Sequence, residues 1–442
     1  MKKLIALFLA IVMLLCLAAC AGKEAPAANA PASAAETPDD TAAAAPAQDA
    51  AGESAQPNGK TLHYWSCWNE TEPQAEAIKR TIARFESETG YTVEVRWIGR
   101  DINKTAGMSI DAGEAIDVYD ADAALLTPDN AMDIDALAAE LGLKDDILPA
   151  FTLWQESVSP VGDNHWYAVP YQPFVGALFY NKAIFREAGV DAIPETWDEF
   201  LSVCAQIKAA GYDPMTVDDA YVVLLYMQEL GLCMGNEAAC ALGTSTGEAW
   251  DNDTVREVMT KWQEFTELGY FSSTVGGNQY PAAQNSELAL GTAAMYFNGS
   301  WLPGEVASIT GDDFEWGVMY MPSMNGNESR IPMIGCCELA VSPKTEDPEG
   351  SVLFLKYLTD AQTCQDLADT AMCLPLVSGV EYPAALADTE AIFTNAQGAF
   401  RWQVWSASVT SEVQILANTY FHELIGGQCT ADEFIQHMID GQ

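Results

Sequence analysis

The fold is decided by residues 60–98, which are KTLHYWSCWNETEPQAEAIKRTIARFESETGYTVEVRWI. Within this stretch, residues 62–65 form a short apolar run typical of a buried strand. Residues 73–89 have the apolar spacing of a helix and are followed by Gly90, a typical residue just after a helix end. Residues 91–98 then alternate apolar and polar side chains, which indicates a second strand. A strand, a helix and a strand in this order predict an α/β fold, in which helices pack on a sheet.

Further strands and helices follow the same pattern. Residues 116–119 predict a third, short strand, and Thr196 with Glu199 three positions later forms a capping box that opens a helix. Another helix is predicted to start at Asp253, and a further one at Pro348, where proline favours the first helical position. The predicted inward-facing residues of these last two helices are Val255, Val258, Met259, Trp262 and Phe265, and Val352, Leu355 and Leu358.

The N-terminus has the parts of an export signal. Two lysines precede an apolar run over residues 4–19, which is shorter than the roughly 20 residues needed to span a bilayer. The run ends Leu-Ala-Ala before Cys20 and resembles a bacterial lipobox. This predicts a signal peptide over residues 1–19 and a lipidated Cys20, with plain secretion as the alternative. Residues 20–58, rich in Ala and Pro and without an aromatic residue, predict a disordered tether.

The 442-residue chain carries a formal net charge of −43. Such an acidic chain argues against nucleic acid as a partner, because nucleic-acid binding rests on Lys and Arg that neutralise phosphates. The part after the tether exceeds a typical single domain, which predicts two lobes. The nine cysteines after the lipobox show no CxxC pair and no zinc-type Cys/His cluster, so neither a metal nor another cofactor is predicted. We expect most of them to be buried free thiols, with local disulfides Cys233–Cys240 or Cys364–Cys373 as the alternative.

Eight short motifs occur along residues 60–442. They are residues 64–69 (YWSCWN), 112–119 (AGEAIDVY), 166–170 (WYAVP), 178–182 (LFYNK), 194–200 (PETWDEF), 293–301 (AAMYFNGSW), 339–344 (LAVSPK) and 354–359 (FLKYLT). Each is weak alone, but in this order they resemble the family 1 extracellular solute-binding proteins of ABC transporters, to which the maltodextrin-binding proteins belong.

The resemblance implies a two-lobed periplasmic-binding-protein-like fold, with a sheet flanked by helices in each lobe and a ligand cleft at the hinge. It further implies a non-catalytic lipoprotein that binds a sugar or oligosaccharide by hinge closure and delivers it to the permease of an ABC importer. The protein is expected to be a monomer at the extracellular face of the bacterial cytoplasmic membrane, or on the periplasmic side in a two-membrane cell.

The same resemblance gives expected lobe boundaries. The N-terminal lobe would comprise residues 59–175 and about 335–375, and the C-terminal lobe about 176–334 and 376–442. The family usually has a glycine-rich loop where this chain has Gly335-Cys336-Cys337-Glu338, and Cys67 also lies in the first binding loop. Because these thiols change the chemistry of the expected cleft, the ligand cannot be copied from a relative.

Candidate ligand-binding residues combine flat aromatic rings with polar side chains, as a sugar requires. Ligands of open α/β sheets bind beyond the carboxyl ends of strands, and residues 65–70 and Asp120 lie at the first and third predicted strand ends. Asn298 and Trp301 belong to a turn where the family commonly places ligand contacts. The predicted ligand-binding residues are Trp65, Trp68, Asn69, Glu70, Asp120, Tyr171, Gln172, Asn298, Trp301, Glu338, Trp402 and Trp405. Core packing is the alternative for Trp65, Trp402 and Trp405.

Three other functions remain open. Lys and Arg are scarce in the candidate loops, so aromatic rings beside carboxylates would also suit a cation such as a polyamine, through cation–π contact. A lipoprotein that senses a ligand for a receptor would have the same sequence features. Residues 243–247 (GTSTG) match the G-x-S-x-G pattern of serine hydrolases, with His422 and His437 later in the chain. That pattern needs a strand before the serine, which the flanking residues do not predict, so we do not expect an enzyme.

Overall fold

The computed structural model describes residues 58–244, 246–276, 283–311, 313–325, 332–394, 400–401 and 409–441. All of them lie in the unit of the chain that spans residues 54–442. The predicted signal peptide, the lipobox and the tether up to residue 57 lie outside the described residues, as do Ser245, Trp402 and Trp405.

The described strands belong to one sheet. They are β1 (Thr61–Ser66), β2 (Thr92–Trp97), β3 (Val118–Ala121), β4 (Ala168–Asn181), β5 (Asp213–Thr216), β6 (Ala293–Gly299), β7 (Trp316–Met319), β8 (Met333–Val341) and β9 (Phe400–Arg401).

Helices alternate with these strands along the chain, as an α/β fold requires. The α-helices are α2 (Pro73–Thr89), α3 (Ile102–Ala112), α4 (Asp135–Glu140), α5 (Pro149–Ser157), α6 (Lys182–Glu187), α7 (Trp197–Ala209), α8 (Val222–Met234), α9 (Asn236–Ala241), α10 (Asp253–Glu267), α11 (Ala283–Ala289), α12 (Leu302–Thr310), α13 (Pro348–Thr359), α14 (Ala361–Ala371), α15 (Thr389–Thr394), α17 (Ser411–Ile425) and α18 (Ala431–Asp440). The 3-10 turns are η1 (Ala123–Leu125), η2 (Leu242–Thr244), η3 (Glu248–Trp250) and η4 (Ala384–Leu386).

The strand order explains how distant segments of the chain meet. The order is β2-β1-β3-β8-β4-β6-β5, with β7 paired to β4 and β9 to β8. β1 is parallel to β2 and β3, and β5 is parallel to β6, whereas the pairs β3–β8, β8–β4 and β4–β6 are antiparallel. The parallel strands β1 to β3 therefore run opposite to β5 and β6, and both groups end at the middle of the sheet.

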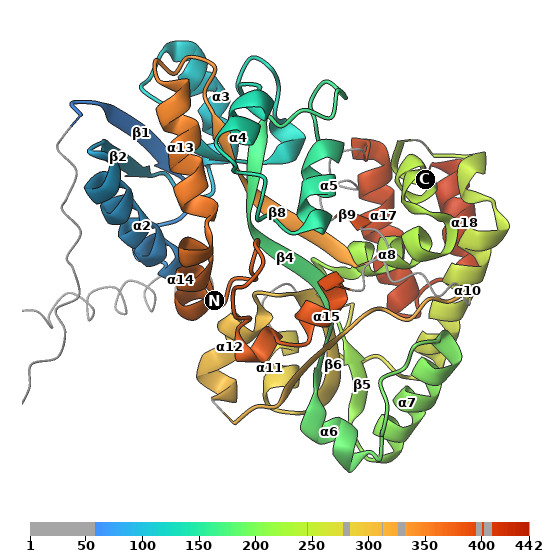
Figure 1. Ribbon diagram of the computed structural model, residues 1–442. Coiled ribbons are helices and arrows are strands. Elements are labelled where there is room, and N and C mark those ends of the chain that lie inside the picture. Colours follow the sequence, from blue (N-terminus) through green and yellow to red (C-terminus); the bar gives the residue numbers. More distant parts are fainter. Residues whose placement is uncertain are drawn as a thin grey trace, which may run out of the picture. The chain divides into compact units, whose positions relative to one another are not determined.

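The register fixes where these ends lie along β4. At the end of β3, Ala121 pairs with Glu338 of β8, which pairs with Pro170 of β4. At the end of β6, Gly299 pairs with Gly176 of β4. Positions 170 and 176 are six residue steps apart along β4, or at most about 20 Å. Figure 1 shows β4 and β8 running through the middle, with β1 and β2 on one side and β5 and β6 on the other.

Two large hydrophobic clusters hold the helices to the sheet. One gathers α7, α8, α10, α17 and α18 around Trp197, Trp250 and Trp262. The other runs from β1, α2 and α13 along β4 and β8 to β6 and α12, with Phe85, Phe354 and Tyr296 among its members. A smaller third cluster lies between β3 and α3. The predicted α/β fold is confirmed, with a central sheet flanked by helices (Figure 1).

Local sequence signals account for several element ends. Helix α2 ends at the predicted residue because Gly90 adopts a left-handed conformation with φ 76°. The capping box at the start of α7 forms as predicted. The Thr196 side chain accepts a hydrogen bond from the backbone N–H of Glu199, and the Glu199 side chain accepts one from the backbone N–H of Thr196. In α10 the buried side chains are the five predicted from the helical period.

The third strand differs from its prediction. It was expected over residues 116–119 and is observed as Val118–Ala121. The Asp117 carboxylate accepts a hydrogen bond of 2.8 Å from the backbone N–H of His63 and therefore replaces a strand carbonyl at that position. Asp117 also accepts from Thr345, so its role is structural.

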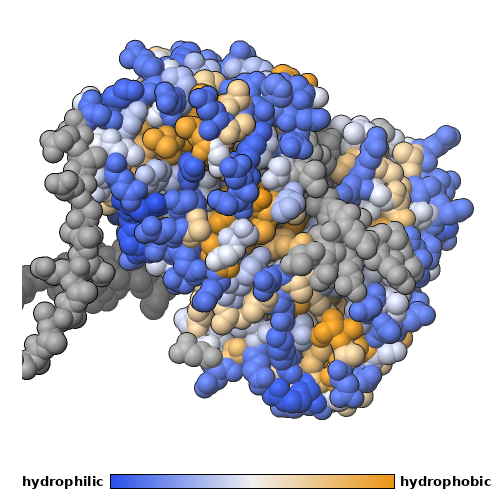
Figure 2. Space-filling model, viewed as in Figure 1, coloured by the Kyte–Doolittle hydropathy of each residue, from blue (hydrophilic) through white to orange (hydrophobic). Residues whose placement is uncertain are grey.

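The surface is strongly polar, and the described cysteines are free. Figure 2 shows that hydrophilic residues cover most of this face, with smaller apolar areas between them. No described helix is long and apolar enough to cross a bilayer.

The nine described cysteines are free thiols, and Cys204, Cys336, Cys364 and Cys429 are the buried ones, so neither alternative disulfide is formed.

Candidate functional site

A buried carboxylate marks the end of β3. Asp120 is 2 % exposed, and its Oδ2 accepts hydrogen bonds of 2.8 Å from the Tyr64 hydroxyl and 2.9 Å from the backbone N–H of Cys67. Its Oδ1 accepts a hydrogen bond from the Tyr171 hydroxyl. Burial raises the pKa of Asp120, whereas the hydrogen bonds from Tyr171, Tyr64 and Cys67 act in the opposite direction. Asp120 therefore joins β1, β3 and β4 at one point.

The same carboxylate fixes an aromatic ring through Tyr171. Trp68 Nε1 donates a hydrogen bond of 2.7 Å to the Tyr171 hydroxyl, which in turn donates to Asp120. The chain of hydrogen bonds Trp68–Tyr171–Asp120 sets the plane of the Trp68 indole, because its N–H has one direction. The Arg100 guanidinium lies 4.2 Å from the centroid of the Trp68 ring and is paired with Glu72 at 2.7 Å.

Gln172 lies where the ladder of β4 is interrupted. The register between β4 and β8 shifts between Tyr171 and Pro173, and Gln172 adopts a left-handed conformation with φ 46°. This conformation is strained for a residue with a side chain. Gln172 is buried, its Oε1 accepts from the Cys373 thiol at 3.6 Å, and its Nε2 has no hydrogen-bond partner among the described residues. An amide donor is thus buried and unpaired beside Tyr171.

A second unpaired amide lies at the end of β6. Asn298 is fully buried, its Oδ1 accepts a hydrogen bond of 2.6 Å from the backbone N–H of Gly299, and its Nδ2 has no partner among the described residues. The Trp301 ring lies 5.4 Å from Phe174 and 6.1 Å from Tyr221, centroid to centroid. A Cβ at position 299 would collide with the Trp301 ring, so the close approach of ring and backbone requires glycine.

Sequence reasoning missed Asp218 and Tyr221 on this side. Asp218 follows β5, which is parallel to β6, and it accepts hydrogen bonds from the Tyr296 hydroxyl and, at 2.7 Å, from the backbone N–H of Ala220. Burial raises its pKa. Asp218 thus stands at the end of β5 as Asp120 stands at the end of β3, each held by a tyrosine hydroxyl and a backbone N–H. An aspartate just after a short strand was the available signal, but residues 213–216 (DPMT) contain an aspartate and a proline, which strands disfavour, and so do not predict a strand.

Trp65, Asn69 and Glu70 were also predicted to bind ligand, but their side chains make other contacts. Trp65 is 2 % exposed and packs in the core cluster with α3, on the opposite face of β1 from Tyr64. It is therefore a core residue, because successive strand residues point to opposite faces. Asn69 and Glu70 are exposed, and their side chains bind Glu72 at 3.0 Å and Lys79 at 2.9 Å. Trp402 and Trp405 lie outside the described residues.

Glu338 is fully buried but faces away from Asp120. Its Oε2 accepts a hydrogen bond of 2.7 Å from the backbone N–H of Ala123, and its Oε1 has no partner among the described residues. Burial first, and then the nearby Asp122, raise the pKa of Glu338 well above its ordinary value. Through its hydrogen bond with Ala123, Glu338 is placed to anchor the start of η1.

Three thiols lie near Tyr171 and Asp120. Cys67 follows β1, Cys337 pairs with Tyr171 across β4 and β8, and Cys373 donates to Gln172. Burial raises the pKa of each thiol, to about 12 for Cys373, and the neighbouring Asp120 adds to the effect for Cys67 and Cys337. These groups are neutral at physiological pH and hence weak nucleophiles.

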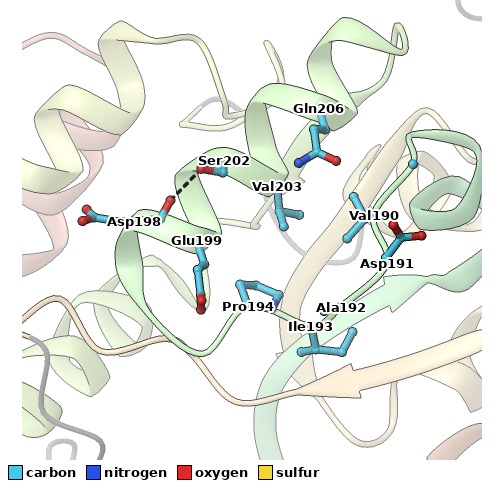
Figure 3. Close-up of a pocket in the computed structure, with 11 residues that line it drawn as sticks. Val190, Asp191, Ala192, Ile193, Pro194, Asp198, Glu199, Ser202, Val203 and Gln206 are labelled. Carbon is cyan, nitrogen blue, oxygen red and sulfur yellow. Dashed lines mark hydrogen bonds between the residues drawn. The ribbon is translucent and has the colours of Figure 1, made fainter.

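A pocket opens elsewhere, beside the N-terminal half of α7. It has a volume of about 450 Å³ and is lined by residues of the α6–α7 loop and of α7 itself, as Figure 3 shows. Ser202 Oγ donates to the carbonyl oxygen of Asp198 at 3.0 Å, and Glu199 caps the helix. None of the predicted ligand-binding residues lines it. No aromatic ring lines it either, so it lacks the surface that stacks on a sugar.

The hydrolase alternative is wrong for the described part of the motif. The residues before Ser245 form α9 and the 3-10 turn η2, and no strand precedes them there. A nucleophile elbow requires a strand directly before the serine. The helical flank therefore removes the structural basis of the match.

Comparison with known proteins places the chain in a family. Residues 80–394 match the model of the bacterial extracellular solute-binding proteins. A multiple sugar-binding protein of Streptococcus mutans is 27 % identical over 224 residues, which are 48 % of this chain and 52 % of that protein. The chain thus matches about half the length of this curated relative.

Solved structures share the fold along most of the chain. A chitin oligosaccharide binding protein has a TM-score of 0.64 at 21 % identity and covers 88 % of this chain and 98 % of its own. The solute-binding protein RafE in complex with raffinose has a TM-score of 0.65 at 19 % identity, covering 86 % of this chain and 99 % of its own. The family model matches most of the chain, and the α/β fold agrees with it. The chain therefore belongs to the bacterial extracellular solute-binding proteins, a family of non-catalytic binding proteins.

Proposed function

We propose that this protein binds a sugar or oligosaccharide between the ends of β1 and β3 and the ends of β5 and β6. The observation that carries the proposal is the pair of buried amide donors, Gln172 Nε2 and Asn298 Nδ2, left unpaired on either side of the middle of β4. An unpaired buried donor costs about 1 to 3 kcal/mol, which a ligand hydroxyl would offset. Trp68 and Trp301 supply the aromatic faces on which the C–H groups of a sugar pack.

The chemistry of the surrounding groups favours a neutral polyhydroxy ligand. Arg100 is the cation beside Trp68, and it is already paired with Glu72, so no free cation is available there for a phosphate or carboxylate. Asp120 is buried and already accepts three hydrogen bonds from the protein, which weakens the case for a polyamine at that carboxylate. The names of similar proteins also mention sugars: one is a multiple sugar-binding protein, one binds chitin oligosaccharides and one was solved with raffinose.

The transport role follows as part of the same proposal. Lobes with the boundaries given above would close on the ligand by bending β4, β8 and the segment near residues 374–378. Binding then shifts the population to the closed form, which the permease of an ABC importer would recognise. Lipidation at Cys20 would keep a monomeric binding protein at the extracellular face of the membrane, on its tether.

The first test is a thermal-shift screen against mono- and oligosaccharides, with Trp301→Ala as the probe. A ligand at about 100 times its Kd stabilises the native state by about 2.7 kcal/mol and raises the Tm. We expect one sugar class to raise the Tm of the wild type, and Trp301→Ala to weaken that sugar's affinity about tenfold or more, because an aromatic stacking face is lost. Isothermal titration calorimetry gives the Kd of each variant.

The matched control is Trp316→Ala, which removes a half-buried tryptophan from β7, opposite Asn181 at the end of β4 that lies away from the proposed site. This variant should keep the wild-type affinity. Equal losses in both variants would contradict the assigned site, and a shift with polyamines alone would overturn the ligand class.

The hydrogen-bond chain to Trp68 can be tested with two phenylalanine substitutions. Tyr64→Phe and Tyr171→Phe each remove one hydrogen bond to Asp120, and the loss of that bond should cost about 1 kcal/mol of unfolding free energy in each variant. Only Tyr171→Phe also frees the Trp68 indole, so only this variant should weaken sugar binding, by several-fold. Titration calorimetry and urea unfolding measure the two effects, and an equal affinity loss in both variants would contradict the proposed role of Trp68.

A further inference from the structure

Two loops far apart in sequence bring three metal-binding side chains together. Asp133 precedes α4, whereas Asp163 and His165 lie in the connection from α5 to β4. One carboxylate oxygen of each aspartate and the Nδ1 of His165 all lie within 4.8 Å of one another, and all three residues are exposed. Sequence analysis predicts no metal here because the residues do not form a motif.

Both carboxylates are held by one oxygen and present the other to the imidazole. Asp133 Oδ1 accepts from the backbone N–H of Asp135 at 3.0 Å, and its Oδ2 lies 2.8 Å from His165 Nδ1. Asp163 Oδ1 accepts from Ser159 Oγ at 2.7 Å and from the backbone N–H of His165 at 3.0 Å, while its Oδ2 lies 3.7 Å from His165 Nδ1. The Oδ2 atoms of both carboxylates therefore lie toward a single ring nitrogen, and Asp163 Oδ2 also accepts a hydrogen bond of 3.4 Å from the Tyr167 hydroxyl.

These distances match the edges of a coordination polyhedron. A tetrahedral zinc ion with bonds of about 2.0 to 2.2 Å has its ligand atoms roughly 3.3 to 3.6 Å apart. The 2.8 Å and 3.7 Å separations bracket that value, so small side-chain rotations would place all three atoms around one ion. The hydrogen bonds that anchor Oδ1 of each aspartate are the outer-shell contacts that orient metal ligands.

A second histidine shows that two acidic neighbours alone do not make this arrangement. His63 also lies between two carboxylates, but its Nδ1 faces Asp117 at 3.0 Å and its Nε2 faces Glu94 at 3.6 Å. The two carboxylates lie on opposite sides of the ring and do not share an ion with it. At His165 both carboxylates lie at the same nitrogen.

We propose that Asp133, Asp163 and His165 form a binding site for a divalent transition-metal ion, with zinc as the probe. An imidazole and two carboxylates suit zinc, and a fourth position remains open to water. The bound ion would tie the connection before β4 to the segment before α4. This connection already meets that segment through the hydrogen bond of 2.9 Å from Ile134 N–H to the Trp166 carbonyl.

The test is zinc titration of the tag-free, chelator-treated protein by isothermal titration calorimetry. We expect one saturable site that is about tenfold or more weaker in Asp163→Asn and His165→Gln and is unchanged in His63→Gln. Asp163→Asn keeps an oxygen for Ser159 and the His165 backbone, so the loop is retained while the ligand oxygen is lost. Zinc should also raise the Tm of the wild type and of His63→Gln.

Cobalt(II) distinguishes this site from the free thiols. Cobalt bound by Asp133, Asp163 and His165 should show visible d–d bands without the thiolate-to-cobalt charge-transfer band in the near ultraviolet. Equal zinc affinity in all variants, the absence of saturable binding, or a thiolate band that accounts for the bound cobalt would each overturn the proposal.

Discussion

Asp120→Ala is expected to lower the free energy of unfolding by about 3 to 5 kcal/mol. The substitution leaves the Tyr64 hydroxyl, the Tyr171 hydroxyl and the Cys67 N–H without their acceptor in a region closed to water. Each unpaired buried donor carries its own desolvation cost, and a small cavity adds to the sum. Urea unfolding followed by circular dichroism measures the loss.

Asp101→Ala serves as the control for this substitution. Asp101 is exposed, and its side chain forms an ion pair with Lys104 at 3.1 Å, so its removal should change the free energy of unfolding by less than about 0.5 kcal/mol. A loss below about 1 kcal/mol for Asp120→Ala would show that Asp120 does not join the three strands. Any sugar bound by the wild type should also bind this variant more weakly, because Trp68 loses its fixed orientation.

Glu338→Gln is expected to make the protein more stable than the wild type at alkaline pH and to leave it nearly unchanged near pH 5. The folded-state pKa of Glu338 is raised well above the unfolded value of about 4.3, mainly by burial. The stability that protonated Glu338 contributes is fully present below the unfolded pKa and is lost as the pH rises through the folded-state pKa. Glutamine does not ionise, so the difference between the variants should grow with pH, by about 1.4 kcal/mol per pH unit within that window.

For Asp347→Asn, the stability difference from the wild type should depend on pH in the opposite direction. Lys60 and Tyr91 hold the pKa of Asp347 below its ordinary value, so its contribution is present above the unfolded pKa and is lost as the pH falls. Thermal unfolding from pH 3 to 9 should therefore show Asp347→Asn as the less stable variant at neutral pH, with the difference vanishing in acid. A Glu338→Gln curve parallel to the wild type would mean that Glu338 is not protonated in the fold.

The helices were predictable because their signals are local. Gly90 ends α2, and Thr196 with Glu199 starts α7, because each signal acts within a few residues of the chain. The register of the sheet is not local, and it decides which strand ends meet. Sequence alone could therefore place Asp120 near a strand end but could not show that Tyr171 and Trp68 share its hydrogen bonds.

The core position of Trp65, which was the alternative in the sequence analysis, has a simple physical origin. Trp65 lies between Tyr64 and Ser66 in β1, and alternation forces it to the face opposite Tyr64. Once one neighbour is known to reach Asp120, the strand period assigns Trp65 to the core. Asp218 was missed for a related reason, since its position matters only through the pairing of β5 with β6.

The raised thiol pKa values also affect how fast the cysteines are oxidised outside a cell. Burial raises the pKa of Cys233, Cys364, Cys373 and Cys429 to about 12. At neutral pH such a thiol has a thiolate fraction on the order of a thousandfold smaller than an ordinary thiol, and air oxidation and disulfide exchange proceed through the thiolate. These four thiols can therefore persist in a mildly oxidising medium, protected by slow kinetics rather than by a reducing compartment.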